Sequence, residues 1–159
     1  MKNDRRIRVS KSVERMGSTV SVNTMLKTAN GRWIAFIGAD CIWESEKLER
    51  QIAFMKENGY AFSYTKFGMG DKPAYIAGGP DKVMHCDMMK CCWPSYFTVM
   101  YDAEKVGKVT VKDLNENNSY ALWLTISKKE DCYLMPESLA KLLRIRRRFS
   151  PLPLKGKFR

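Results

Sequence analysis

Asp40 is the residue of this sequence best placed to do chemistry. It follows residues 32–37 (RWIAFI), a short and almost wholly apolar run that is typical of a strand buried on both faces. An amphipathic segment comes next, so the order is strand, carboxylate, helix. That order places the carboxylate at the carboxyl edge of a sheet, where open α/β sheets bind their ligands. The alternative is a turn residue whose carboxylate accepts backbone N–H bonds.

A second group of reactive side chains comprises His85, Cys86, Cys91 and Cys92. Its Cys-x4-Cys-Cys spacing differs from the paired Cys-x2-4-Cys and His-x3-5-His ligands of most zinc sites, and adjacent cysteines point apart on a helix or a strand. The spacing therefore favours small buried hydrophobic residues over a metal site. The chain has five cysteines, and an odd number indicates reduced thiols in a cytoplasmic compartment.

Positive charge is concentrated at the two ends of the chain. The formal net charge is +11, and residues 141–159 hold eight basic side chains and no acidic one. Such ends attract phosphates on nucleic acid, anionic lipid or a nucleotide, or they simply keep a tail solvated. In a strand, Arg144 and Arg146 would lie on one face and could meet a phosphate. Aromatic residues are not interleaved with Lys and Arg, which argues against nucleic-acid binding.

The elements that must position these residues form an alternating series. The 159 residues, 45% hydrophobic and 28% charged, fit one globular domain. Hydrophobic spacing predicts helices at 18–29, 45–58 and 118–128, strands at 32–37, 60–65, 96–101 and within 132–145, and a loop at 67–82. In the helix at 45–58, Leu48, Ile52 and Met55 are the predicted inner stripe. The alternation predicts an α/β fold with a largely parallel sheet.

Several motifs, in this order, resemble those of the family-2 glycosyltransferases. They are Asn23, ANGRWIAFIGADCIW at 29–43, EKLERQIAFM at 46–55, YAFSYT at 60–65, FTVMYD at 97–102 and YALWL at 120–124. The resemblance covers about residues 15–148 and implies the GT-A fold, a mixed and mainly parallel sheet flanked by helices. It divides the chain into a partial glycosyltransferase-like domain at 1–148 and a basic C-terminal tail at 149–159.

The resemblance implies transfer of a sugar, with inversion, from a nucleotide-sugar donor to a saccharide or lipid-linked acceptor. In that family an Asp-x-Asp sequence holds Mg²⁺ or Mn²⁺ on the donor diphosphate, and Asp40 matches its second aspartate. Asn23 matches an asparagine near the donor, and Arg144 and Arg146 lie where basic residues meet the diphosphate. The cationic ends favour an anionic surface, so we expect a cytoplasmic protein at the inner face of the membrane.

The sequence departs from the family pattern at functional positions. Gly38 replaces the first aspartate of the pair, Cys41 replaces the aspartate expected after Asp40, and Val22 stands where an arginine is expected. The position of the catalytic carboxylate reads Ser119, and a serine hydroxyl cannot act as a general base near neutral pH without a partner base. Glu116 is the nearby carboxylate that could stand in.

The last departure is at the N-terminus. Members of the family begin with a strand and an Asp-containing turn, and this chain starts after that point, so the first βα unit is expected to be missing. A sheet without its central strand exposes an edge that can pair with a second chain. Two functions therefore stay open: a glycosyltransferase-like protein, active or inactive, and a non-catalytic remnant that associates with another chain.

Overall fold

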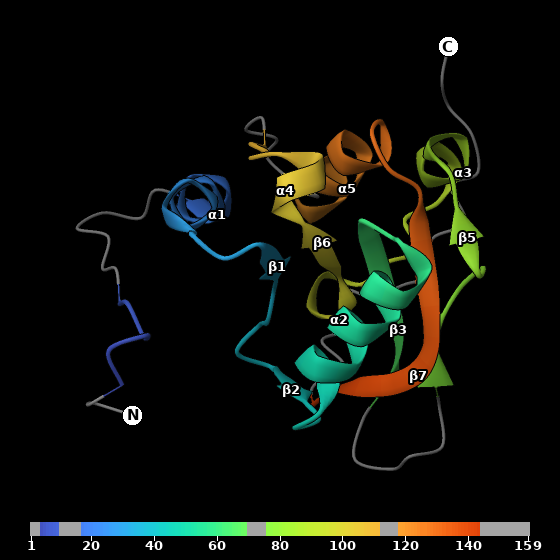
Figure 1. The fold of residues 1–159 in the computed structure, drawn as a ribbon, viewed down its shortest axis with the longest axis horizontal. Coiled ribbons are helices and arrows are strands. Elements are labelled where there is room, and N and C mark those ends of the chain that lie inside the picture. The colour runs from blue at the N-terminus through green and yellow to red at the C-terminus, as the bar shows by residue number, and fades with distance from the viewer. Residues whose placement is uncertain (1–3, 10–16, 70–75, 112–117, 144–159) are drawn as a thin grey trace.

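The computed structural model of the protein describes residues 4–9, 17–69, 76–111 and 118–143 (Figure 1). Its helices are α1 (Gly17–Thr28), α2 (Lys47–Asn58), α3 (His85–Lys90), α4 (Ala103–Val106) and α5 (Asn118–Ser127), with a 3-10 turn η1 (Tyr96–Thr98). Its strands are β1 (Trp33–Ala35), β2 (Cys41–Trp43), β3 (Phe62–Met69), β4 (Ile76–Ala77), β5 (Lys82–Val83), β6 (Met100–Asp102) and β7 (Cys132–Leu142).

The predicted alternation of helices and strands is confirmed in its order. The helices predicted at 18–29, 45–58 and 118–128 are α1, α2 and α5, and the predicted strands overlap β1, β3, β6 and β7. The segment 67–82 is not wholly a loop, because β3 continues to Met69 and the short strands β4 and β5 also fall there or at its end. The first half of the strand predicted at 96–101 is the turn η1.

The described strands form one curled, mixed sheet in the order β1-β6-β3-β7-β2, with β4 beside β3 and β5 beside β7. Among these pairs only β3–β7 is parallel, so the sheet is less parallel than the sequence pattern predicts. The reason is that β6 runs antiparallel between β1 and β3. The strands β1, β3 and β7 nevertheless point the same way, and they share one carboxyl edge.

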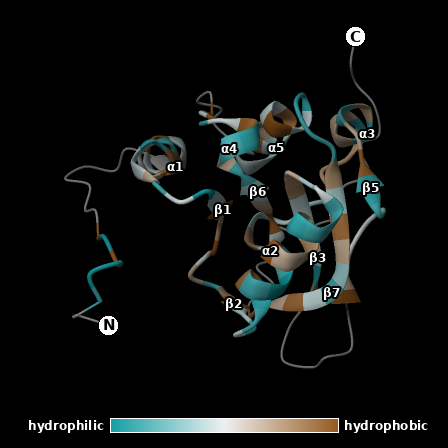
Figure 2. Ribbon diagram, viewed as in Figure 1, coloured by the Kyte–Doolittle hydropathy of each residue, from teal (hydrophilic) through white to brown (hydrophobic). Residues whose placement is uncertain are grey.

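Helices cover both faces of the central strand β3. Its successive side chains point to opposite faces, so neighbouring residues meet different helices. The Ser63 hydroxyl meets Gln51 of α2, whereas the neighbouring Phe62 packs against Trp123 of α5, with ring centroids 6.0 Å apart. The main core lies on the α5 side and contains Phe62, Tyr101, Leu122, Trp123 and Ile126 among its buried residues. Figure 2 shows hydrophobic residues along β7 and on α5. The buried face of α5 is therefore formed by Leu122, Trp123 and Ile126.

The buried face of α2 differs from the predicted one. Leu48 is 44% exposed, whereas Lys47, Gln51 and Met55 are buried. These three residues are spaced by four, so they lie on one face of the helix. Met55 is buried as predicted, whereas Lys47 and Gln51 take the places expected for Leu48 and Ile52, one residue further along. The helix ends as predicted at Gly59, which has a left-handed φ of 72°.

Candidate functional site

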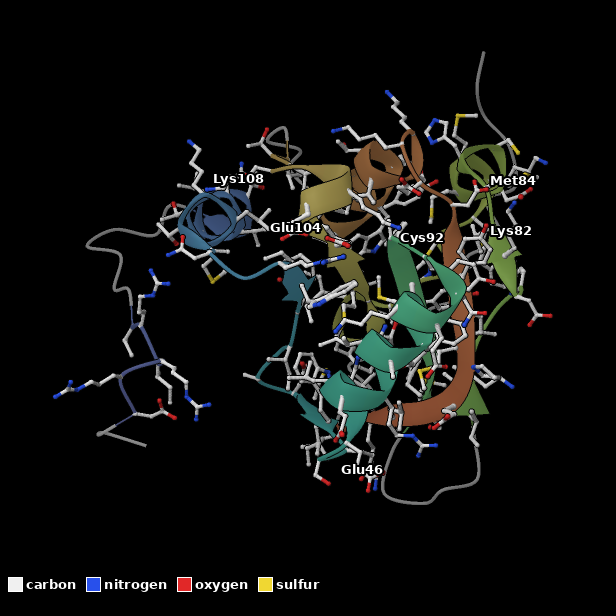
Figure 3. The ribbon with its side chains drawn as sticks, viewed as in Figure 1. Glu46, Lys82, Met84, Cys92, Glu104 and Lys108 are labelled. Atoms are coloured by element: carbon white, nitrogen blue, oxygen red, sulfur yellow. The ribbon has the colours of Figure 1, made fainter. Side chains whose placement is uncertain are left out.

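Asp40 lies at the carboxyl edge of the sheet, as predicted. It follows β1, and the residue that follows β7 lies beside it, since the Leu143 N–H donates a 2.9 Å hydrogen bond to the Asp40 carbonyl. In Figure 1 this edge is the lower one, where β2 and the end of β7 meet, and Figure 3 shows Glu46 of the α2 start at the same edge. This hydrogen bond continues the pairing of Cys41 with Leu142, so Asp40 lies where β2 begins and β7 ends.

The Asp40 side chain is half-buried and turned back onto its own loop. Its Oδ1 accepts a hydrogen bond from the Cys41 thiol at 3.4 Å, and the Cys41 N–H donates to the Gly38 carbonyl at 3.2 Å. Burial, with a smaller effect from the Asp40 carboxylate, raises the pKa of Cys41 to about 11. The thiol is therefore protonated at neutral pH and acts as the donor in this contact.

Gly38 permits this position of the carboxylate. A Cβ atom at residue 38 would lie 2.8 Å from Asp40 Oδ1, closer than a Cβ atom approaches a non-bonded oxygen, and 3.6 Å from Cys41 Sγ. The aspartate that the family carries at this position would therefore force the Asp40 side chain to move. The glycine removes one carboxylate and also gives the other room to fold back.

The described residues fit a divalent cation only in part. No three His, Cys, Asp or Glu side chains of the described segments gather closely enough to hold a metal ion. Asp40 contributes one carboxylate, and Mg²⁺ is held in many proteins by one or two carboxylates together with substrate phosphates. A cation here would take most of its ligands from a bound diphosphate and from water.

Asn23 ties α1 to the segment after α4. Its Nδ2 donates to the Val111 carbonyl and its Oδ1 accepts from the Val111 N–H, each at 2.8 Å. This paired contact uses the amide on both sides. In the structure Asn23 acts as a clamp between two segments that are far apart in sequence, and its role toward a donor stays a prediction.

Ser119 lies in the first turn of α5 and is half-buried. Trp123 is one helical turn further on the same face and packs edge-on against Phe36, with ring centroids 5.5 Å apart. Phe36 directly follows β1, four residues before Asp40. The Ser119 face of α5 is thus connected to the Asp40 loop through two aromatic side chains. The Nε1 of Trp123 is buried without a hydrogen-bond partner among the described residues.

Three predicted site residues, Glu116, Arg144 and Arg146, lie outside the described residues. The described chain ends at Leu143, directly before Arg144 and beside Asp40. Their roles toward a base or a diphosphate stay predictions.

Two cavities lie elsewhere on the molecule. One of about 340 Å³ is lined by the end of α1, β1 and α4, and the other, of about 280 Å³, is lined by the turn after α5 with Tyr60 and Tyr133. Neither is lined by Asp40, Asn23 or Ser119. The candidate site is therefore an edge of the sheet and not one of these two hollows.

A buried polar cluster beside this edge was not predicted from the sequence. Lys47 Nζ donates to Gln51 Oε1, and the Gln51 amide donates to Ser63 Oγ at 3.0 Å and to the Thr98 carbonyl at 3.1 Å. The signal available in the sequence was the i, i+4 spacing of Lys47 and Gln51 next to Trp43. A stripe defined by hydrophobicity alone does not include such residues.

Comparison with known proteins relates this chain to one family. The family described as "Glycosyl transferase family 2" matches residues 1–113. The putative teichuronic acid biosynthesis glycosyltransferase TuaG of Bacillus subtilis is 33% identical over 143 residues, covering 87% of this chain and 57% of the relative. The UDP-Glc:alpha-D-GlcNAc-diphosphoundecaprenol beta-1,3-glucosyltransferase WfgD of Escherichia coli is 31% identical, covering 79% of this chain and 50% of the relative. The chain thus spans about half the length of these relatives.

Solved structures show the same fold. The crystal structure of residues 1–349 of TarS from S. aureus superposes with a TM-score of 0.61 at 15% identity, covering 80% of this chain and 40% of TarS. Its complex with UDP-GlcNAc gives a TM-score of 0.58 at 14% identity, covering 78% of this chain and 38% of TarS. The predicted GT-A-like architecture is thereby confirmed. None of the described helices has the length and hydropathy of a membrane-spanning segment.

Proposed function

The chain belongs to glycosyltransferase family 2, and from that membership we propose that it binds a nucleotide-sugar donor at the carboxyl edge of its sheet. Asp40 would be the protein's ligand to Mg²⁺ or Mn²⁺ on the donor diphosphate. The observation that carries the proposal is the position of Asp40, half-buried at the carboxyl end of β7, where β2 begins. Open α/β sheets bind ligands at this edge.

The chemistry of this site follows from its charges. A divalent cation, when bound, supplies the positive charge that neutralises the leaving diphosphate. Asp40 must turn from Cys41 toward solvent to reach such an ion, and this movement costs one weak thiol hydrogen bond. Arg144 and Arg146, which follow the end of β7, would add positive charge on the same diphosphate.

The site supports donor binding more strongly than it supports transfer of the sugar to an acceptor. Ser119 can donate or accept a hydrogen bond at an acceptor hydroxyl, but it cannot retain the proton that the hydroxyl loses. Glu116 remains the candidate base. We therefore expect donor binding to be retained and sugar transfer to be slow or absent unless Glu116 reaches the acceptor.

The proposed acceptor is a saccharide carried on a lipid diphosphate. The name of the Escherichia coli relative specifies a diphosphoundecaprenol-linked acceptor. The eight basic side chains of residues 141–159 also favour an anionic membrane surface. Both observations support the proposal that the protein acts at the cytoplasmic face of a membrane. This placement requires no membrane-spanning helix in the described part of the chain.

Replacing Asp40 by Asn is the direct test of the donor site. Titration calorimetry of the wild-type chain with UDP should give binding that depends on Mn²⁺. The D40N variant should bind at least about tenfold more weakly, because it loses the only protein carboxylate proposed for the ion. Glu57, exposed on α2, gives the matched control E57Q, which should bind as the wild type does. Absence of heat from the wild type with and without Mn²⁺ would contradict the proposal.

A second candidate function, association with another chain, is favoured by the position of β1. Among the described strands β6 is the only neighbour of β1, so the other edge of β1 is available for a further strand. The cavity of about 340 Å³ adjoins this strand and combines apolar walls from Leu26 and Ile34 with the charged Arg32 and Glu104. Figure 3 shows Glu104 and Lys108 at this end of the molecule, close to α1.

The partner that this edge can be tested against directly is a second copy of the chain. Light scattering after size exclusion, over a range of concentrations, should then show a monomer–dimer equilibrium. Dimers would pair β1 with β1 and leave UDP binding unchanged. A folded monomer at all concentrations would contradict this second function and would leave the donor-site proposal standing.

A further inference from the structure

Lys47 is a buried cation without a buried anion. Its exposed fraction is 0%, and no described carboxylate forms an ion pair with it. Its partners are the Gln51 side-chain oxygen and the face of the Trp43 ring, whose centroid lies 4.9 Å from Nζ. A buried ammonium is costly, and an apolar side chain of similar size usually fits such a place at lower free energy. Its presence here therefore points to a role other than stability.

One side of this cluster holds the strand that follows Asp40. The strand β2 has three residues, lies at the end of the sheet and pairs with β7 alone among the described strands. Its last residue, Trp43, donates a 2.7 Å hydrogen bond from Nε1 to the Phe97 carbonyl and lies under the Lys47 ammonium. Since the strand is so short, these side-chain contacts of Trp43 carry much of its support.

The other side of the cluster holds the strand that precedes Asp40. Lys47 orients the Gln51 amide, and this amide donates to the Thr98 carbonyl in the turn η1. The same turn carries Tyr96, whose ring centroid lies 4.9 Å from that of Phe36. Phe36 is the residue directly after β1. The loop that bears Asp40 is thus fixed at both of its ends by contacts that pass through Lys47.

We propose that Lys47 is a positioning residue, which holds the Asp40 loop in place through Trp43 on one side and through Gln51 and η1 on the other. The proposal deepens the donor-site function and rests on it for its biological meaning. The positioning role of Lys47 can be tested independently of donor binding, because the order of the Asp40 loop can be measured without any donor.

The Cys41 thiol reports the order of this loop directly. Cys41 is half-buried and in contact with Asp40, and thiol alkylation follows the fraction of thiolate. Loosening the loop should expose the half-buried Cys41 sulfur to the reagent and so raise its alkylation rate. Cys86 is exposed on α3, so the sequence-based expectation of a buried position is wrong for it, and it serves as an internal reference in the same protein.

The experiment compares iodoacetamide alkylation of Cys41 and Cys86, by peptide mass spectrometry, in the wild type and in K47M. Methionine fits the space and removes the ammonium, so we expect Cys41 to react about tenfold faster while Cys86 is unchanged. The matched control is K56M on the exposed side of the same helix, which should leave both rates unchanged. A second variant, W43F, removes the hydrogen bond to Phe97 and reduces the ring that faces Lys47, and it should also accelerate Cys41.

An unchanged Cys41 rate in folded K47M and W43F would overturn the positioning role. Equal acceleration of Cys41 and Cys86 would also overturn it, because that result indicates general loosening of the fold. UDP titration of the same variants separates the two proposals. A wild type that binds no UDP contradicts the donor site, whereas the Cys41 rates still decide the role of Lys47.

Discussion

Replacing Gly38 by Asp is expected to tighten Mn²⁺-dependent binding of UDP by about tenfold or more, equivalent to about 1.4 kcal/mol. The new side chain restores the first carboxylate of the Asp-x-Asp pair. Its Cβ would lie 2.8 Å from the present position of Asp40 Oδ1, so the Asp40 carboxylate must leave Cys41 and turn outward. Two carboxylates then face the same ion, in the arrangement that Mg²⁺ and Mn²⁺ sites with phosphate ligands use.

The G38A variant is the matched control for this prediction. It adds the same Cβ and displaces Asp40 in the same way, but it adds no charge. Calorimetric titration of UDP should therefore show G38D binding more tightly than G38A, with the difference lost when Mn²⁺ is omitted. Equal affinities of G38D and G38A would show that residue 38 does not face the ion, and the site would then be wrongly placed.

The position of Asp40 was predictable, because it depends on the order of elements along the chain. An apolar strand followed by a carboxylate and a helix leaves few places for that carboxylate. The orientation of its side chain was not predictable, because it depends on a contact with the neighbouring thiol and on the space above Gly38. The sequence alone shows that the Asp-x-Asp pair lacks its first aspartate. The orientation of the remaining aspartate, Asp40, toward its own loop is visible only in the structure.

The face that α2 buries shows where hydrophobic periodicity fails. Leu48, Ile52 and Met55 define the expected stripe, and Met55 is buried as expected. Lys47 and Gln51, however, face the sheet in place of Leu48 and Ile52. A polar side chain can face inward when every bond it needs is available, here from Ser63, the Thr98 carbonyl and the Trp43 ring. Those partners come from three other elements, so no local pattern in 45–58 contains the information. The position of β6 was likewise not predictable. This strand runs antiparallel between β1 and β3, and the order of strands along the chain does not indicate which of them are neighbours in the sheet.

Lys47 and Gly38 both lie beside the same edge of the sheet, and each departs from a rule. A fold is expected to depart from local rules where a site is built, because function there outweighs packing. Lys47 departs from the rule for buried charge, and Gly38 departs from the family's ligand pattern. The first departure strengthens the case that the edge is a constructed site, whereas the second weakens its capacity to hold a cation.

Replacing Lys47 by Met is expected to change the pH dependence of stability more than any other single substitution discussed above. Burial lowers the pKa of Lys47 from 10.5 to about 8. Below pH 8 the lysine is charged in both states, and the folded state carries the full cost of the buried charge. Between pH 8 and pH 10.5 the unfolded state binds a proton that the folded state does not, so the free energy of unfolding of the wild type rises with pH. The total rise is about 3 kcal/mol.

The K47M variant lacks this rise. Its stability relative to the wild type should therefore be greatest near pH 7 and should fall by about 3 kcal/mol as the pH increases from 8 to 10.5. Loss of the partner of Gln51 Oε1 costs about 1–3 kcal/mol, but this cost is the same at every pH and does not affect the slope. Other groups with shifted pKa values, such as Cys41 and Tyr101, are present in both proteins and cancel in the difference.

Urea denaturation of the wild type, K47M and K56M at pH 7, 8, 9 and 10 measures this difference. K56M should follow the wild type at every pH, since Lys56 is exposed on the same helix and has none of the buried contacts of Lys47. Parallel profiles of K47M and the wild type would mean that Lys47 keeps an ordinary pKa and is hydrated in solution. The ammonium would then not be confined between Trp43 and Gln51, and the route by which we connect it to the Asp40 loop would fail with it.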